Sequence, residues 1–100
     1  MRQVMVRYRV KPDRVAENEE LVRAVYEELG RVRPEGLAYA TFKLDDGVSF
    51  VHIARTTGEG NPLTGLDAFQ AFQQGIPDRC DEQPVVTDME TIGAHRAFDG

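Results

Sequence analysis

Four side chains that could act on a small molecule fall on one face of a predicted set of strands. His52 and Thr41 should lie opposite each other in a hairpin, with Tyr39 one step along and Arg7 on a neighbouring strand. An imidazole has a pKa near neutrality, so His52 could remove a proton from a bound hydroxyl group. The phenol, the threonine hydroxyl and the guanidinium could orient an oxygenated ring compound. Alternatively, these residues form hydrogen bonds across a subunit interface.

The hairpin that would hold these residues spans 36–55 and turns at Asp46-Gly47. An Asp-Gly pair between two alternating strand-forming runs predicts a type I′ turn, which needs positive φ at both central residues. Side chains alternate between the faces of a strand. We expect helices to cover the face with Ala38, Ala40, Phe42, Leu44, Val51 and Ile53. The other face is mixed and carries Leu37, Tyr39, Thr41, Lys43, Val48, Phe50, His52 and Ala54.

On each side of the hairpin, the sequence predicts one helix and one strand. Residues 4–10 alternate as a first strand, and helical spacing then runs from Asp13 to a stop at Gly30. After the hairpin, Thr64-x-x-Asp67 predicts a capping box for a second helix. A final strand is expected at residues 85–92, with a further extension to 98 as an alternative. The inward stripe of the second helix is predicted as Leu66, Phe69, Phe72 and Ile76.

This order of elements, βαββαβ, predicts one domain over residues 1–100 with an α+β, ferredoxin-like fold. Two crossovers and one hairpin give an antiparallel sheet of strand order 4-1-3-2, with both helices on one face. The mixed face and Met5 would then be uncovered, and they expose more apolar area than monomers normally leave in water. A second copy packed face to face would bury this area. We therefore expect a homodimer formed through the open sheet face.

Composition argues against several other classes of function. The net charge of −5 is unlike that of a nucleic-acid-binding surface, which needs clustered Lys and Arg. No apolar run approaches the roughly 20 residues of a membrane helix, and the strand pattern at the N-terminus predicts a cytoplasmic protein without a signal peptide. Two histidines and one cysteine lack ligand spacing, so we expect no metal site. Cys80 is expected to be an unreactive thiol.

Three segments carry a resemblance to a known family: residues 6–10 (Val-Arg-Tyr-Arg-Val), residues 17–25 (Glu-Asn-Glu-Glu-Leu-Val-Arg-Ala-Val) and residues 66–72 (Leu-Asp-Ala-Phe-Gln-Ala-Phe). Together with the hairpin, they resemble the dimeric α/β-barrel superfamily and, within it, the antibiotic-biosynthesis-monooxygenase-like group. That superfamily includes cofactor-independent quinol and polyketide monooxygenases, haem-degrading enzymes, lactone isomerases and proteins without an established activity. The oxygenases among them often use an Asn, a Trp and a His or Arg. This chain has no Trp, and its asparagines are Asn18 and Asn61.

Two functions follow from the resemblance and the candidate residues. The first is a homodimer that binds a small hydrophobic or aromatic metabolite and acts as a cofactor-independent monooxygenase on a quinol or polyketide-type compound. His52, Tyr39 and Arg7 would be catalytic, and Thr41 and Phe50 would contact the ligand. The second is a non-enzymatic dimeric binding or stress-response accessory protein. In similar proteins the pocket can lie between the sheet and the helices. Its wall would then consist of Tyr8, Tyr26, Phe42, Phe69 and Phe72.

Overall fold

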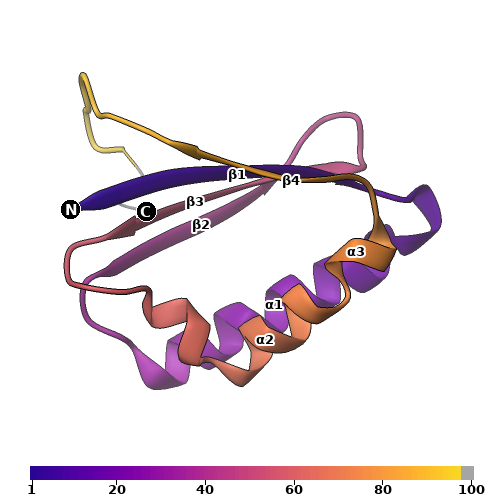
Figure 1. Cartoon of the computed structure of the whole chain (residues 1–100), viewed down its shortest axis with the longest axis horizontal. Helices are drawn as coiled ribbons and strands as arrows, with labels where there is room; N and C mark the ends of the chain where they lie inside the picture. The colour runs from indigo at the N-terminus through magenta and orange to yellow at the C-terminus, as the bar shows by residue number, and fades with distance from the viewer. Residues whose placement is uncertain (98–100) are drawn as a thin grey trace.

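The computed structural model describes residues 1–97 and consists of an antiparallel sheet with its helices on one side (Figure 1). The strands are β1 (Arg2–Val10), β2 (Leu37–Lys43), β3 (Ser49–Thr56) and β4 (Cys80–Asp88). The helices are α1 (Val15–Val32), α2 (Asp67–Gln74) and the short α3 (Ile76–Arg79), with 3₁₀ turns η1 (Pro12–Arg14) and η2 (Pro62–Gly65). The strand order is β2-β3-β1-β4, with every neighbouring pair antiparallel. The predicted α+β, ferredoxin-like topology is confirmed.

The β2–β3 hairpin has the predicted register but a different turn. Thr41 pairs with His52 and Phe42 with Val51, as the Asp-Gly signal implied. Gly47 has a φ of 78°, but Asp46 does not have a positive φ. A type I′ turn needs positive φ at both positions, so that prediction was wrong. The Asp46 carboxylate instead accepts hydrogen bonds from the backbone N–H groups of Val48 (2.9 Å) and Ser49 (2.8 Å). Asp46 therefore closes the turn with its side chain rather than with its backbone conformation.

The ends of α1 and β4 differ from their predicted positions. The stop at Gly30 was wrong: α1 continues to Val32, and Arg33 adopts the left-handed conformation (φ 48°) that ends the helix. The Arg33 N–H donates to the carbonyl of Leu29 at 2.9 Å, which satisfies one of the terminal carbonyl groups. Strand β4 begins at Cys80, before the predicted 85, and ends at Asp88. The alternative extension to 98 ends outside the described residues.

The start of α2 does not use the predicted capping box. Leu66 occupies the N-cap position and makes no side-chain cap bond. The polar residues serve the preceding turn instead: the Thr64 hydroxyl donates to the Asn61 carbonyl (2.8 Å), and Asn61 Oδ1 accepts from the Leu63 N–H (3.0 Å). The inward stripe was predicted correctly, because all four of its members are buried: Leu66, Phe69, Phe72 and Ile76.

The two faces of the sheet are the reverse of the prediction. The face with Tyr8, Phe50 and His52 packs against the helices and forms the core, whereas no helix within residues 1–97 covers the face with Val51 and Ile53 (Figure 1). Both faces are apolar enough to be buried, so alternation alone did not identify the covered one. Hydroxyl groups on the covered face are hydrogen-bonded to side chains of α1: Tyr8 to Asn18, and Thr41 to Tyr26. The open face exists as predicted, and Met5, which pairs with Ile53, lies on it as expected, but the hairpin residues on it are the ones predicted for the covered face.

Candidate active site

A cavity of about 560 Å³ lies between the helix-facing side of the sheet and α2 with its neighbouring turns. Its size falls within the range of about 300–1,000 Å³ that is typical of small-molecule sites. Tyr8, Tyr39 and His52 bring polar groups to its wall from three strands, and Arg2, Asn61 and Gln73 also line it. The rest of the wall is mainly apolar and includes Val4, Val6, Leu63, Phe69, Phe72 and Ile76.

His52 lies at the centre of the polar part of this wall. Its side chain is buried, and both ring nitrogens have hydroxyl partners: Tyr8 Oη lies 2.7 Å from Nε2, and Tyr39 Oη lies 2.6 Å from Nδ1. Thr41 Oγ1 is a second neighbour of Nδ1 at 3.1 Å. The register explains this cluster, because Thr41 and His52 are direct cross-strand partners and Val6, two residues before Tyr8, is the partner of His52 on β1.

Helix α1 completes the polar cluster from the other side. Tyr26 Oη lies 2.7 Å from Thr41 Oγ1, and its ring stacks on Tyr39 with centroids 5.5 Å apart. Asn18 is fully buried on the same helix, and its Nδ2 donates to Tyr8 Oη at 3.0 Å. Two helical side chains thus hold the hydroxyl groups of two strands.

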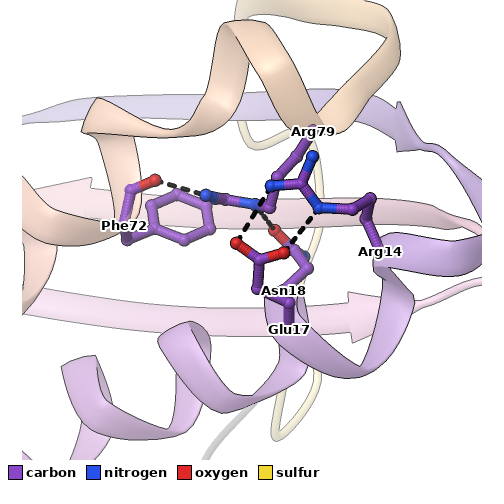
Figure 2. A network of polar contacts seen from close by, with 5 residues as sticks. All are labelled: Arg14, Glu17, Asn18, Phe72 and Arg79. Atoms are coloured by element: carbon purple, nitrogen blue, oxygen red, sulfur yellow. Dashed lines mark hydrogen bonds and ion pairs between the residues drawn. The ribbon is translucent and has the colours of Figure 1, made fainter.

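The cluster ends in a buried cation, Arg79 of α3. Figure 2 shows its guanidinium between Asn18 and Phe72: Nε donates to Asn18 Oδ1 at 3.2 Å, and Nη2 donates to the Phe72 carbonyl at 2.8 Å. The guanidinium carbon also lies 5.3 Å from the centroid of the Phe72 ring. Glu17, the acidic residue next to Asn18, is paired with Arg14. Arg79 is only 1% exposed, so an uncommon buried charge is held by neutral acceptors and an aromatic face.

We call the series Arg79, Asn18, Tyr8, His52 and Tyr39 the polar chain. Burial lowers the pKa of His52 to about 4, so its imidazole is neutral at physiological pH. Burial also raises the pKa of Tyr8 and of Tyr39, which keeps both phenols protonated. The polar chain is therefore a cation at one end and a series of neutral donors and acceptors that leads to the cavity.

The structure brings together only some of the predicted site residues. His52, Tyr39 and Thr41 are hydrogen-bonded neighbours, as expected from the hairpin. Arg7 was placed with them wrongly: it pairs with Val51 and therefore points to the opposite, open face. Arg7 is therefore on the other side of the sheet from the cavity and from the His52 ring.

The predicted aromatic residues are divided between three environments. Phe69 and Phe72 line the cavity. Phe50 is buried and stacks on Tyr8 with ring centroids 5.6 Å apart, so it supports the wall from within the core instead of lying at the dimer seam. Phe42 was wrongly included in the pocket wall, because it lies on the open face and is 41% exposed.

Sequence reasoning missed the inner half of the polar chain. In the sequence, Asn18 is distinguished only as a polar residue on the apolar stripe of a helix. Arg79 stands in a segment of mixed composition where no periodic pattern indicates that its side chain is buried. Gly75 makes room for Arg79, since a Cβ atom at that position would collide with Nη1. Among residues 1–97, no group of three or more His, Cys, Asp or Glu side chains could hold a metal ion. No helix in the same range is long and apolar enough to cross a bilayer.

Comparisons with known proteins identify the fold. No protein-family model and no curated protein sequence matches the chain. A structure named antibiotic biosynthesis monooxygenase is 21% identical, with a TM-score of 0.76 over 93% of this chain and 100% of that one. Rv0793 from Mycobacterium tuberculosis is 17% identical, with a TM-score of 0.75 over 93% and 96%. A "putative antibiotic biosynthesis monooxygenase" from Nitrosomonas europaea is 16% identical, with a TM-score of 0.77 over 93% and 100%.

At these identities the likeness establishes the architecture and not the activity. The predicted resemblance is confirmed at that level: this chain shares the ferredoxin-like fold of structures named as antibiotic biosynthesis monooxygenases.

Proposed function

We propose that this protein binds a small, mainly apolar aromatic or polyketide-type metabolite in the cavity and oxygenates it without a cofactor. The observation that carries the proposal is the concentration of polar groups in a mainly apolar wall, where Tyr8, Tyr39 and His52 meet. A cavity of this kind orients a ligand by a few hydrogen bonds and holds it by apolar contact. The names of the structural neighbours supply the class of reaction.

The proposed chemistry begins with loss of a proton from the bound ligand. The ligand hydroxyl would donate to Tyr8 Oη while the Tyr8 proton moves to Nε2 of His52, 2.7 Å away. The resulting anion would accept a hydrogen bond from Tyr39, which stabilises it. The electron-rich ring then reacts with O₂. In a substrate whose ring carries a CH₂ group, that group becomes a carbonyl; in a quinol, a ring C–H becomes C–OH and the quinol becomes a quinone. In both cases the second oxygen atom leaves as water. The substrate supplies all the electrons, so the reaction needs no added reductant.

The second candidate function is a dimeric binding protein without catalysis. Two observations favour it: both nitrogens of His52 already have partners, and the chain has no Trp. Under this function the polar groups would only orient the ligand. The two candidates share the cavity and differ in whether O₂ is consumed.

We also propose that the protein is a homodimer joined through the open sheet face. Ala40, Val51 and Ile53 on this face are only half-buried by their own chain, and Val85 on β4 is 64% exposed. Packing against a second copy would remove this apolar area from water. The cavity lies on the other side of the sheet, so dimer formation would leave its wall intact.

Oxygen uptake with a panel of quinols and polyketide-type aromatic compounds tests the catalytic function. At least one compound should give uptake, and His52→Gln should slow it by about 100-fold, as expected for loss of a general base. His95→Gln is the matched control, because His95 is exposed and lies outside the polar chain. Unchanged turnover in His52→Gln would remove His52 from the mechanism.

Thermal shift in the presence of the same compounds separates the two functions. A ligand that binds the folded state raises the melting temperature. Stabilisation without oxygen uptake would favour the binding protein, and the absence of both responses across the panel would contradict both functions.

A further inference from the structure

The hydrogen-bond directions in the polar chain can be assigned from its buried end. An arginine guanidinium has five N–H donors and no acceptor, so the Asn18 atom that faces Arg79 Nε at 3.2 Å must be the carbonyl oxygen Oδ1. The amide nitrogen Nδ2 then faces Tyr8 Oη at 3.0 Å and donates to it. Arg79 thereby removes the ambiguity that usually attends an asparagine amide.

The next link follows from the proton count of a phenol. Tyr8 Oη carries a single proton, and its second partner is Nε2 of His52 at 2.7 Å. Tyr8 is 2% exposed, so its proton would lack a partner in the protein if it did not point to this nitrogen. Nε2 consequently accepts, and a neutral imidazole must carry its proton on Nδ1.

Tyr39 differs from Tyr8 in its surroundings. Nδ1–H of His52 points to Tyr39 Oη at 2.6 Å, with Thr41 Oγ1 as a second acceptor at 3.1 Å. In this arrangement Tyr39 Oη accepts from His52, and its own hydroxyl proton is not donated to the imidazole. Tyr39 is half-buried and lines the cavity, so this proton can be donated to water or to a ligand there. The opposite tautomer would use the Tyr39 proton and leave the Tyr8 proton without a partner in the protein, on a side chain that is only 2% exposed.

We infer that Arg79 and Asn18 are positioning residues that fix the Nδ1–H tautomer of His52 and leave Tyr39 as a hydrogen-bond donor to the cavity. The site then takes a ligand oxygen that can accept from Tyr39: a carbonyl or a phenolate. Only this preference for an acceptor oxygen rests on the proposed function. The tautomer is a property of the protein without ligand and can be measured without any assay of activity.

Long-range ¹H–¹⁵N correlation spectra distinguish the two neutral imidazole tautomers from each other and from the imidazolium. At about pH 8, where histidines are neutral, we expect an excess of about tenfold or more of the Nδ1–H form in His52 of the wild type. The chain has two histidines, so His95, which is exposed, is the reference signal in the same spectrum. A wild-type His52 in the Nε2–H form would overturn the inference.

Asn18→Asp is the decisive variant, because it keeps the shape of the side chain and removes its N–H donors. The carboxylate should bind Arg79 and accept the Tyr8 proton, so Tyr8 Oη becomes an acceptor from Nε2–H. His52 is therefore expected to change to the Nε2–H tautomer. Asn61→Asp is the matched control: its Oδ1 accepts from the Leu63 N–H, which an aspartate can also do, and the tautomer should not change. The same tautomer in wild type and Asn18→Asp would contradict the inference.

Two further variants keep the inference testable if Asn18→Asp does not fold. Tyr8→Phe removes the donor to Nε2, and Arg79→Met removes the donor that orients Asn18. Each should lower the excess of the Nδ1–H form by at least about fivefold. Arg14→Met is the control for Arg79, because Arg14 pairs with Glu17 at the surface and stands outside the polar chain. An unchanged excess in folded Arg79→Met would remove Arg79 from this role.

Discussion

Tyr8 and His52 meet across strands β1 and β3 with Oη and Nε2 2.7 Å apart, in the layer between the sheet and the helices. The contact joins the cavity wall to the buried part of the polar chain. It also places a titratable group in the core, which makes the stability of the fold sensitive to pH.

Stability should fall as the pH is lowered through the range between the two pKa values of His52. Burial lowers its pKa from 6.5 to about 4, so the unfolded state binds more protons than the folded state between these values. This contribution to stability is fully present above about pH 6.5 and is lost towards pH 4, with a loss on the order of 3 kcal/mol. Urea denaturation at a series of pH values measures it.

The variant His52→Gln isolates this contribution from that of the carboxylates. Its stability should change less between about pH 4 and 6.5 than that of the wild type, whereas His95→Gln should follow the wild type. Parallel curves for wild type and His52→Gln would show that His52 titrates alike in both states.

Two neighbouring residues of β3 test the assignment of the sheet faces and the dimer together. Phe50→Asp puts a charge into the core and should prevent folding, because the buried carboxylate would have no partner. Val51→Asp puts the same charge on the open face, so the protein should fold. If the proposed dimer exists, Val51→Asp should sediment as a monomer at micromolar concentration, whereas the wild type should sediment as a dimer.

Val32→Asp is the control for added charge, because Val32 is exposed at the end of α1 and away from the sheet. It should remain dimeric. A monomeric wild type would contradict the dimer but not the face assignment, whereas a folded Phe50→Asp would contradict the face assignment.

Two glycines should respond in opposite ways to substitution by alanine. Gly75→Ala would place a Cβ atom against Nη1 of the buried Arg79 and should destabilise the fold by about 1–3 kcal/mol. Gly30 lies inside α1, and no other part of residues 1–97 comes within 4 Å of the position of a Cβ atom there. Gly30→Ala should therefore stabilise the fold by about 0.5–1 kcal/mol. Thermal or urea denaturation gives both values. Equal effects of the same sign would show that Arg79 is not confined as described.

The thiol of Cys80 should react slowly with alkylating reagents in the native state. The residue is a buried free cysteine, and burial raises the pKa of its thiol, which lowers the fraction of thiolate. Reaction with iodoacetamide at neutral pH should be at least about tenfold faster in denaturant than in buffer. Equal rates would place the thiol at the surface.

Much of the candidate site was predictable because local periodicity and turn chemistry depend on residues that are close in the sequence. The Asp-Gly signal and strand alternation predicted the pairing of Thr41 with His52, and this pairing places both next to Tyr39. Helical spacing predicted the stripe that includes Phe69 and Phe72, which line the cavity. The type of turn and the ends of the helices were less predictable. Asp46 closes the hairpin turn with its side chain, and Arg33, instead of a glycine, adopts the left-handed conformation that ends α1.

By itself, the sequence determined the order of the elements, the register of the hairpin and the topology of the sheet. Only the tertiary structure decided which face of the sheet is covered. Both faces are apolar, and the choice depends on whether the polar tips of the covered face find partners. Those partners come from far along the chain: Asn18 and Arg79, which bond to each other, are 61 residues apart. No local sequence pattern indicates such a pair, because the two residues contact each other only once the helices have packed on the sheet.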